Sequence, residues 1–263
     1  FDSVFGADDL DIPDFLKWRR PRTAAAAHER CPMTEAAPLL DRLARVDERI
    51  AAAARANGRE PSDITRIVIT KFHPAQLVRD LFALGVRDVG ENRQQELTAK
   101  RAELSDLSDL RWHFVGQIQT NKARAVRGAA SVVHSVDRAK LAEALDGAAD
   151  PGASPLDVLV QINLTTDVGR GGADESDVVA LAEHVAGCGG LRLRGVMAVA
   201  PLDEHPAAAF ARLAEHAARV RTVVPEATWI SAGMTGDFED AIAAGATHLR
   251  IGSAITGNRP AHG

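Results

Sequence analysis

The sequence predicts an α/β fold: a single (β/α)8 barrel of the TIM type, preceded by one helix. Eight short apolar runs alternate with helical patterns between Ile64 and Gly257. Near-continuous apolar strands of this kind are typical of a parallel sheet that helices cover on both faces. Eight such units close into a barrel more readily than they remain open. A doubly wound open sheet is the alternative, but Lys71-Phe-His-Pro74, where the first run ends, lacks the glycine-rich fingerprint of that fold.

The elements follow one another in regular order. An amphipathic helix is expected between Thr34 and Gly58, because apolar residues recur there at spacings of three and four. Strands are expected at 64–71, 86–92, 111–116, 131–135, 156–163, 191–200, 228–232 and 248–255. Helices are expected to begin near Pro74, Gln94, Thr120, Arg138, Glu175, His205 and Asp237.

The chain divides into an appendage and one domain. Residues 1–32 have no core-forming periodicity, so we expect them to be disordered, with the folded domain spanning 34–258 and beginning near Met33. Residues 8–17 resemble the C-terminal tail of the tubulin-like bacterial division protein. This short similarity leaves recruitment to the division septum open.

Composition excludes several classes of protein. A formal net charge of −5 with interspersed charges gives no basic footprint, so we expect no nucleic-acid partner. Cys31 and Cys188 form no CxxC pair, and the nine histidines show no metal-ligand spacing, so we expect no metal site and a reducing compartment. No apolar stretch approaches the roughly 20 residues that span a bilayer, and there is no signal pattern. The expected location is the cytoplasm.

Lys71 is the first candidate for chemistry. It ends the apolar run 64–71, and the carboxyl ends of barrel strands face the active-site mouth. Partial burial there would favour the neutral amine, which can form a Schiff base with an aldehyde. The alternative is a lysine that extends from a strand end into solvent.

Two glycine-containing loops predict a phosphate cup at the same mouth. Ser231-Ala-Gly-Met-Thr-Gly236 leads into a helix, where small residues, hydroxyls and the helix N-terminus can bind an anion. Arg250-Ile-Gly-Ser253 follows from the last strand. Either loop alone could be an ordinary capped turn. Together, in the positions where barrels bind phosphate and opposite a lysine, they favour pyridoxal phosphate as the ligand.

Several segments together resemble one known family, the pyridoxal phosphate homeostasis proteins, also called YggS or PROSC. The resemblance covers about residues 36–258 in order. It rests on Thr70-Lys-Phe-His-Pro74, Gly90-Glu-Asn-Arg-Gln-Gln-Glu96, the run from Trp112 to Lys122, His134-Ser-Val-Asp137, Leu193-Arg-Gly-Val-Met197, Ser231-Ala-Gly-Met-Thr235 and Arg250-Ile-Gly252.

This resemblance implies a barrel similar to the N-terminal domain of alanine racemase, with pyridoxal phosphate bound to Lys71 as a Schiff base. It implies that Arg250 faces the pyridine nitrogen, Asn92 lies near the ring substituents and Met197 lies near the ring face. The residues that it implies around the phosphate are Ser231, Gly233, Met234, Thr235, Gly252 and Ser253. A permanent cation beside the ring nitrogen disfavours its protonation, so the ring would be a weak electron sink.

The sequence departs from the racemase pattern. It contains no tyrosine, and Arg93 stands where the family commonly has one. Alanine racemases take one catalytic tyrosine from a second domain. The resemblance therefore favours a protein that buffers or delivers pyridoxal phosphate, with dependent apoenzymes as partners and a monomer or weak dimer as the assembly. A pyridoxal phosphate-dependent amino-acid racemase and a Schiff-base phosphosugar aldolase without cofactor are the alternatives.

Two further features are weaker candidates. His113 lies in an aromatic run that more often fills a barrel core than carries chemistry. Residues 167–172 look like a phosphate loop but lack its full spacing, so we interpret them as a mobile loop at the mouth that could bring Arg170 near the cofactor.

Overall fold

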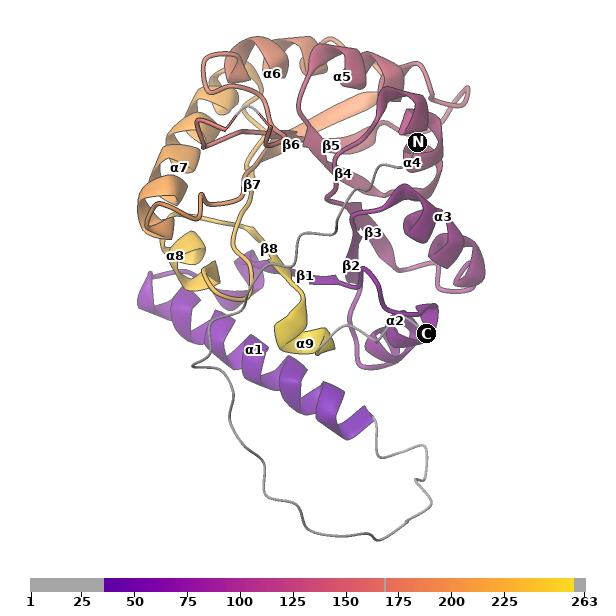
Figure 1. Cartoon of the computed structure of the whole chain (residues 1–263), viewed down its shortest axis with the longest axis vertical. Helices are drawn as coiled ribbons and strands as arrows, with labels where there is room; N and C mark the ends of the chain where they lie inside the picture. Colours follow the sequence, from indigo (N-terminus) through magenta and orange to yellow (C-terminus); the bar gives the residue numbers. More distant parts are fainter. Residues whose placement is uncertain (1–35, 168, 258–263) are drawn as a thin grey trace, which may run out of the picture.

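The chain folds into a closed barrel of eight parallel strands with helices between them (Figure 1). The computed structural model describes residues 36–167 and 169–257, so the appendage expected at 1–32 lies outside the described residues. The strands follow chain order around the barrel, and β8 pairs with β1 to close it, with Val68 opposite Ile251. The (β/α)8 prediction is confirmed. No helix in the described ranges is long and apolar enough to cross a membrane.

Each predicted run overlaps a strand, and most strands are shorter than their runs. The strands are β1 (Thr65–Ile69), β2 (Asp88–Glu91), β3 (Arg111–Phe114), β4 (Val132–Val136), β5 (Leu156–Gln161), β6 (Leu191–Met197), β7 (Trp229–Ser231) and β8 (His248–Ile251). The α-helices are α1 (Ala36–Ala56), α2 (Ala75–Ala83), α3 (Gln94–Glu103), α4 (Ala123–Ala129), α5 (Ala139–Asp146), α6 (Val178–Ala186), α7 (Pro206–Val223), α8 (Phe238–Ala243) and α9 (Ser253–Thr256). Short 3-10 helices η3 (Pro61–Asp63) and η4 (Thr120–Lys122) precede β1 and α4.

The predicted extent of the last strand, 248–255, was wrong. Gly252 leaves the extended conformation, with φ −109° and ψ −99°, and acts as the N-cap of α9. The apolar residue that continued the strand pattern, Ile255, is instead buried inside this short helix. An extra helix after the last strand brings backbone N–H groups to the mouth of the barrel, as phosphate-binding barrels commonly do.

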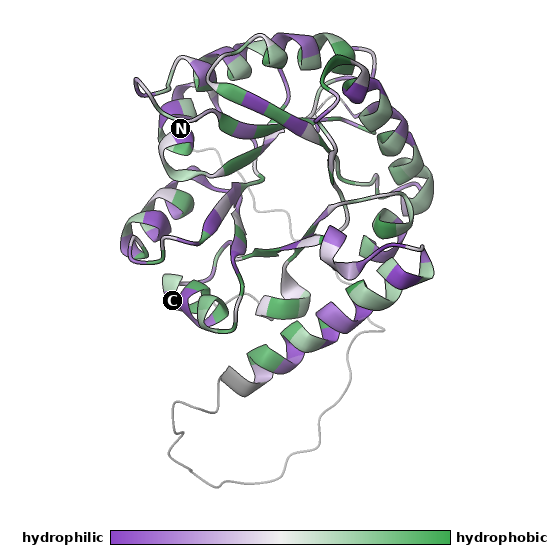
Figure 2. Ribbon diagram, turned by 180° about the vertical axis from the view of Figure 1, so that it is seen from behind, coloured by the Kyte–Doolittle hydropathy of each residue, from purple (hydrophilic) through white to green (hydrophobic). Residues whose placement is uncertain are grey.

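Helix α1 covers the seam where the barrel closes. It lies against α8 and α9 (Figure 1), which are only six and four residues long. Leu39, Leu43, Val46 and Ile50 on its apolar side are all buried, as the spacing predicted. Hydrophilic and hydrophobic residues alternate along α1 and the outer helices (Figure 2), as expected of helices that bury one side.

The barrel interior holds an unusual number of polar side chains. His113, His134, His248 and Arg250 are each at most 5% exposed. His248 lies 4.2 Å from the Trp229 ring, measured between centroids, and its Nδ1 is 2.8 Å from the Thr247 hydroxyl. Burial is the main reason why the pKa of His248 falls to about 3.

Substitution of Gly195 by alanine should destabilise the barrel. Gly195 in β6 has φ +152°, and a Cβ there would lie 1.8 Å from the Trp229 carbonyl oxygen in β7. We expect Gly195→Ala to lower the free energy of unfolding by more than about 2 kcal/mol, because backbone must move. Gly128→Ala is the matched control: Gly128 is an exposed residue of α4 with nothing within 4 Å of the place that a methyl group would take, and alanine should add about 0.5–1 kcal/mol. Urea unfolding of both variants tests this, and equal effects would contradict it.

Stability should fall as the pH drops below the normal histidine pKa of 6.5. The folded state keeps His248 neutral, while the unfolded chain takes up a proton, so stability present above pH 6.5 is lost between pH 6.5 and about 3. At pH 5 the loss from this residue is about 2 kcal/mol. Urea unfolding at pH 7 and pH 5 should show a smaller loss in His248→Gln than in the wild type by about this amount. Equal losses in the two proteins would disprove the assignment.

Candidate functional site

A cavity of about 490 Å³ opens at the carboxyl ends of the strands. Residues that follow strands far apart in the chain meet there, because parallel closure brings these ends to one mouth. Eight of the ten residues predicted to contact the cofactor line it: Lys71, Asn92, Met197, Met234, Thr235, Arg250, Gly252 and Ser253.

Lys71 is held at the cavity by a tight turn after β1. The next residue, Phe72, has φ +67°, a conformation that is strained for a bulky side chain. Its N–H donates to Glu96 Oε2 at 2.8 Å, which ties the turn to α3. Lys71 is half-buried and forms no salt bridge with any described carboxylate, so its amine is available to a ligand.

A second lysine lies below this turn, but its charge is already paired. Lys100 Nζ is 2.7 Å from Glu91 Oε1 and donates to the Thr70 carbonyl at 2.8 Å. The Thr70 hydroxyl donates to the same carboxylate at 2.6 Å. Burial of Glu91 raises the pKa of its carboxyl, although Lys100 and Thr70 act in the other direction. Lys100 therefore supports the strand end, and Lys71 is the amine that faces the cavity.

The adjoining wall is formed by the residues that lead into α8 and α9. Gly233 makes the turn from β7 possible: its φ is +87°, and a Cβ would lie 2.7 Å from Ala241 Cβ and 2.8 Å from Phe238 Cα. Backbone N–H groups in these two loops have no acceptor among the described residues; they belong to Thr235, Gly236, Gly252 and Ser253. Unpaired donors on two loops of small residues suit a phosphate group.

Arg250 supplies a buried cation at the base of the cavity. Its side chain donates to Ser231 Oγ at 2.7 Å and to the Ala198 carbonyl at 2.8 Å, and no described carboxylate forms an ion pair with it. Burial lowers the pKa of Arg250 to about 10, so the guanidinium stays charged near neutral pH. A fixed positive charge here suits a ligand atom that accepts a hydrogen bond and does not need to be protonated.

Asn92 and Met197 complete the walls. Asn92 Oδ1 is buried without a hydrogen-bond partner among the described residues, and such an atom indicates a missing donor from a ligand or from water. Gly116 packs directly on this residue, since a Cβ at position 116 would lie 2.0 Å from the Asn92 carbonyl oxygen. Met197, at the end of β6, is 2% exposed and offers an apolar surface to a flat ring.

Two predicted residues, Ser231 and Gly233, do not belong to the lining of the cavity within the described part of the chain. Ser231 is fully buried beneath Arg250, and its hydroxyl bridges Arg250 and His134. Gly233 shapes the turn, and its carbonyl accepts the Arg250 N–H at 2.9 Å. Both residues act behind the wall that the loops form.

Some residues that line the cavity were not predicted from the sequence. Gln161 ends the apolar strand β5 and lines the cavity; a polar residue at the carboxyl end of an apolar strand is a signal that could have identified it. His73, Val115 and Val199 also line the cavity. Arg170 lines a neighbouring pocket and not this one. No described group of His, Cys, Asp or Glu residues could hold a metal ion.

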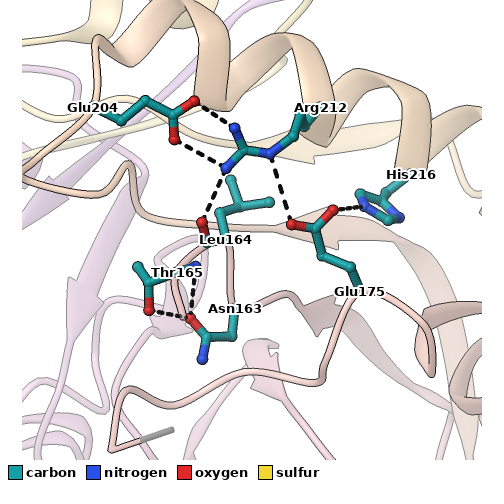
Figure 3. A network of polar contacts seen from close by, with 7 residues as sticks. All are labelled: Asn163, Leu164, Thr165, Glu175, Glu204, Arg212 and His216. Atoms are coloured by element: carbon teal, nitrogen blue, oxygen red, sulfur yellow. Dashed lines mark hydrogen bonds and ion pairs between the residues drawn. The ribbon is translucent and has the colours of Figure 1, made fainter. Parts of the chain in front are cut away.

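Salt bridges anchor the segment after β5 against α7 (Figure 3). Arg212 in α7 donates to the Leu164 carbonyl at 2.9 Å and also pairs with Glu204 and Glu175. His216 Nε2 lies 2.7 Å from Glu175 Oε2, on the other side of the same carboxylate. These contacts fix the path of the chain directly after Gln161, which in turn donates to the Gly171 carbonyl at 2.8 Å.

Sequence comparison places the chain among known proteins. The family model of the alanine racemase N-terminal domain matches residues 67–260. The pyridoxal phosphate homeostasis protein of Pseudomonas aeruginosa is 42% identical over 224 residues, which cover 84% of this chain and 96% of that protein. The protein of the same name from Escherichia coli is 36% identical over 222 residues, covering 82% and 95%.

Solved structures agree with this placement. PipY of Synechococcus elongatus, with pyridoxal phosphate bound, is 35% identical with a TM-score of 0.72, and the match covers 82% of this chain and 99% of that one. Alanine racemase of Corynebacterium glutamicum, at 16% identity and a TM-score of 0.61, shares the fold over 85% of this chain and 62% of its own. Since the family model and close relatives each match most of its length, the chain belongs to the pyridoxal phosphate homeostasis protein family, with a barrel of the alanine racemase N-terminal type.

Proposed function

We propose that this protein binds pyridoxal 5'-phosphate in the cavity at the barrel mouth, as a Schiff base with Lys71, and serves the intracellular homeostasis of this cofactor. One observation carries the proposal: three features meet at a single cavity. Among the described residues, they are a lysine without a carboxylate partner, a loop wall whose N–H groups have no acceptor, and a buried cation. The names of the relatives and the bound ligand of PipY support the same cofactor.

Each part of the ligand has a complementary group in the chain. Pyridoxal phosphate supplies an aldehyde that an amine can capture with loss of water, and an aromatic ring. Thr235, Gly252 and Ser253, with Met234 beside them, would bind the phosphate through backbone N–H groups and hydroxyls. Asn92 would pair with a ring substituent, and Met197 would lie on the ring face. Ser231 and Gly233 would contribute through Arg250 and the loop turn that they hold.

The charge at Arg250 favours storage over turnover. Enzymes that stabilise carbanions on this cofactor benefit from a protonated ring nitrogen, and a buried guanidinium opposes that protonation. We infer that the barrel buffers the cofactor and delivers it to dependent apoenzymes in the cytoplasm. The alternatives of an amino-acid racemase and of a phosphosugar aldolase have less support, because the relatives at 35–42% identity point to cofactor binding and homeostasis.

A monomer or weak dimer fits the described surface. The large hydrophobic side chains that it exposes, Leu40, Leu202 and Met234, come from α1, the β6–α7 connection and the loop after β7. Scattered apolar residues do not make the continuous patch that a stable dimer buries.

Binding should depend on Lys71. Wild-type protein incubated with pyridoxal phosphate should show a yellow absorbance band, and the band should be absent from Lys71→Ala. Borohydride reduction followed by peptide mapping should place the modified lysine at position 71. Lys140→Ala, which removes an exposed lysine of α5, is the matched control and should behave as wild type. Colourless wild-type protein would overturn the proposal and favour the phosphosugar barrel.

The fate of the bound cofactor separates storage from catalysis. Loaded protein mixed with an apo-aminotransferase should restore aminotransferase activity while its own yellow band declines. The same loaded protein should exchange the α-proton of amino acids with deuterated water little faster than Lys71→Ala does, because an unprotonated ring beside Arg250 is a weak electron sink. Rapid exchange together with failure to activate the apoenzyme would favour the racemase alternative.

A further inference from the structure

A chain of hydrogen bonds crosses the barrel interior from Arg250 to Asp88. Arg250 Nη1 donates to Ser231 Oγ at 2.7 Å, and this hydroxyl lies 2.9 Å from His134 Nδ1. His134 Nε2 lies 2.9 Å from His113 Nδ1, and His113 Nε2 lies 2.8 Å from Asp88 Oδ1. The five side chains come from β8, β7, β4, β3 and β2 and are all buried. The chain therefore connects the cavity to the first residue of β2, at the opposite end of the barrel.

The two ends fix the direction of every bond in this chain. A guanidinium can only donate, so the Ser231 hydroxyl accepts from Arg250. Asp88 can only accept, and each imidazole carries one proton, so counting back from Asp88 leaves His134 Nδ1 as an acceptor and the Ser231 hydroxyl as its donor. His134 then carries its proton on Nε2 and donates to His113 Nδ1. His113 in turn donates from Nε2 to the Asp88 carboxylate, which can only accept.

The charge states agree with this direction. Burial lowers the pKa of both His113 and His134, so each imidazole is neutral and carries one proton. Burial alone would raise the pKa of Asp88, but hydrogen bonds from His113 and Arg111 outweigh it, and the pKa is lowered. Arg111 donates to Asp88 Oδ2 at 2.8 Å and holds the carboxylate in place.

This chain of hydrogen bonds is suited to hold the Arg250 charge in place and not to conduct protons. Proton transfer along it would reverse every donor, which would require Arg250 to give up a proton. With a pKa of about 10 it does not do so near neutral pH. The hydrogen bonds form an oriented series of dipoles that ends in the Asp88 carboxylate. These dipoles are directed at the buried Arg250 cation, which has no direct carboxylate partner among the described residues.

We propose that Ser231, His134, His113 and Asp88 are positioning residues that hold the Arg250 guanidinium toward the cofactor cavity. The effect on the cofactor rests on the proposed function, under which Arg250 would face the pyridine ring. Asp88 would influence the bound cofactor from the opposite end of the barrel, without contact with it. A role in packing alone would give no such influence.

The first test needs no cofactor. Side-chain 15N NMR of the full-length protein at neutral pH, with signals assigned through His113→Gln and His134→Gln, reports which ring nitrogen carries the proton. We expect His113 and His134 both to be neutral and protonated on Nε2. In Ser231→Ala, His134 should lose the hydrogen-bond shift at Nδ1. A proton on Nδ1 of either ring in the wild type would overturn the proposal.

The second test measures the bound cofactor. Ser231→Ala should weaken pyridoxal phosphate binding by about tenfold, as is common when the partner of a binding residue is removed, and should shift the visible band. Ser231→Thr, which keeps the hydroxyl, should restore both. Asp88→Asn should shift the band in the same direction by a smaller amount, although residue 88 lies outside the cavity lining.

His248→Gln is the matched control, because it removes another buried imidazole from the same interior without interrupting the chain. It should leave the affinity and the band as in the wild type. Wild-type affinity and spectrum in both Ser231→Ala and Asp88→Asn would overturn the positioning role. A wild type that stays colourless would count against the proposed function instead, and the NMR test would still decide whether the oriented chain exists.

Discussion

A permanent positive charge buried inside a β-barrel is the constraint on which the rest of this interior depends. Arg250 cannot shed its proton near neutral pH, and it lies in a low-dielectric core where an unpaired charge is costly. Its guanidinium is satisfied by a carbonyl and a serine hydroxyl, while the nearest carboxylate of its network is three side chains further away. Much of the polar content of β2, β3, β4 and β7 is explained by this one cation.

The lysines and the arginine of this interior differ in whether a carboxylate already pairs with them. Lys100 is neutralised by Glu91 below the strand end, so its role is structural only. Lys71 and Arg250 lack carboxylate partners among the described residues and face one cavity. A ligand with an electrophilic carbon, an anionic group and a ring nitrogen that remains unprotonated satisfies both at once. Pyridoxal phosphate is a ligand of this kind.

The barrel and most of the cavity could be predicted because they depend on local patterns. Eight apolar runs can be identified in the sequence, as can Lys71 at the end of the first run and Arg250 within the last. Closure of the sheet then brings these residues to one mouth. The place of Ser231 was not predictable, since its hydroxyl is directed by partners 19 and 97 positions away in the chain. The helical turn after Gly252 was also missed, because buried residues of a short helix look like a continued strand.

Helix α1 joins the beginning of the described chain to its end: Arg42 Nε donates to the Ile255 carbonyl at 2.6 Å, next to the loop that would hold the phosphate. This contact spans 213 positions, and β1 must also wait for β8 before the sheet can close. Contacts of such long sequence separation form late and slow folding. During synthesis, the lysine side of the pocket leaves the ribosome long before the phosphate side exists. Under the proposed function, only a completed barrel would present both sides of the pocket to the cofactor.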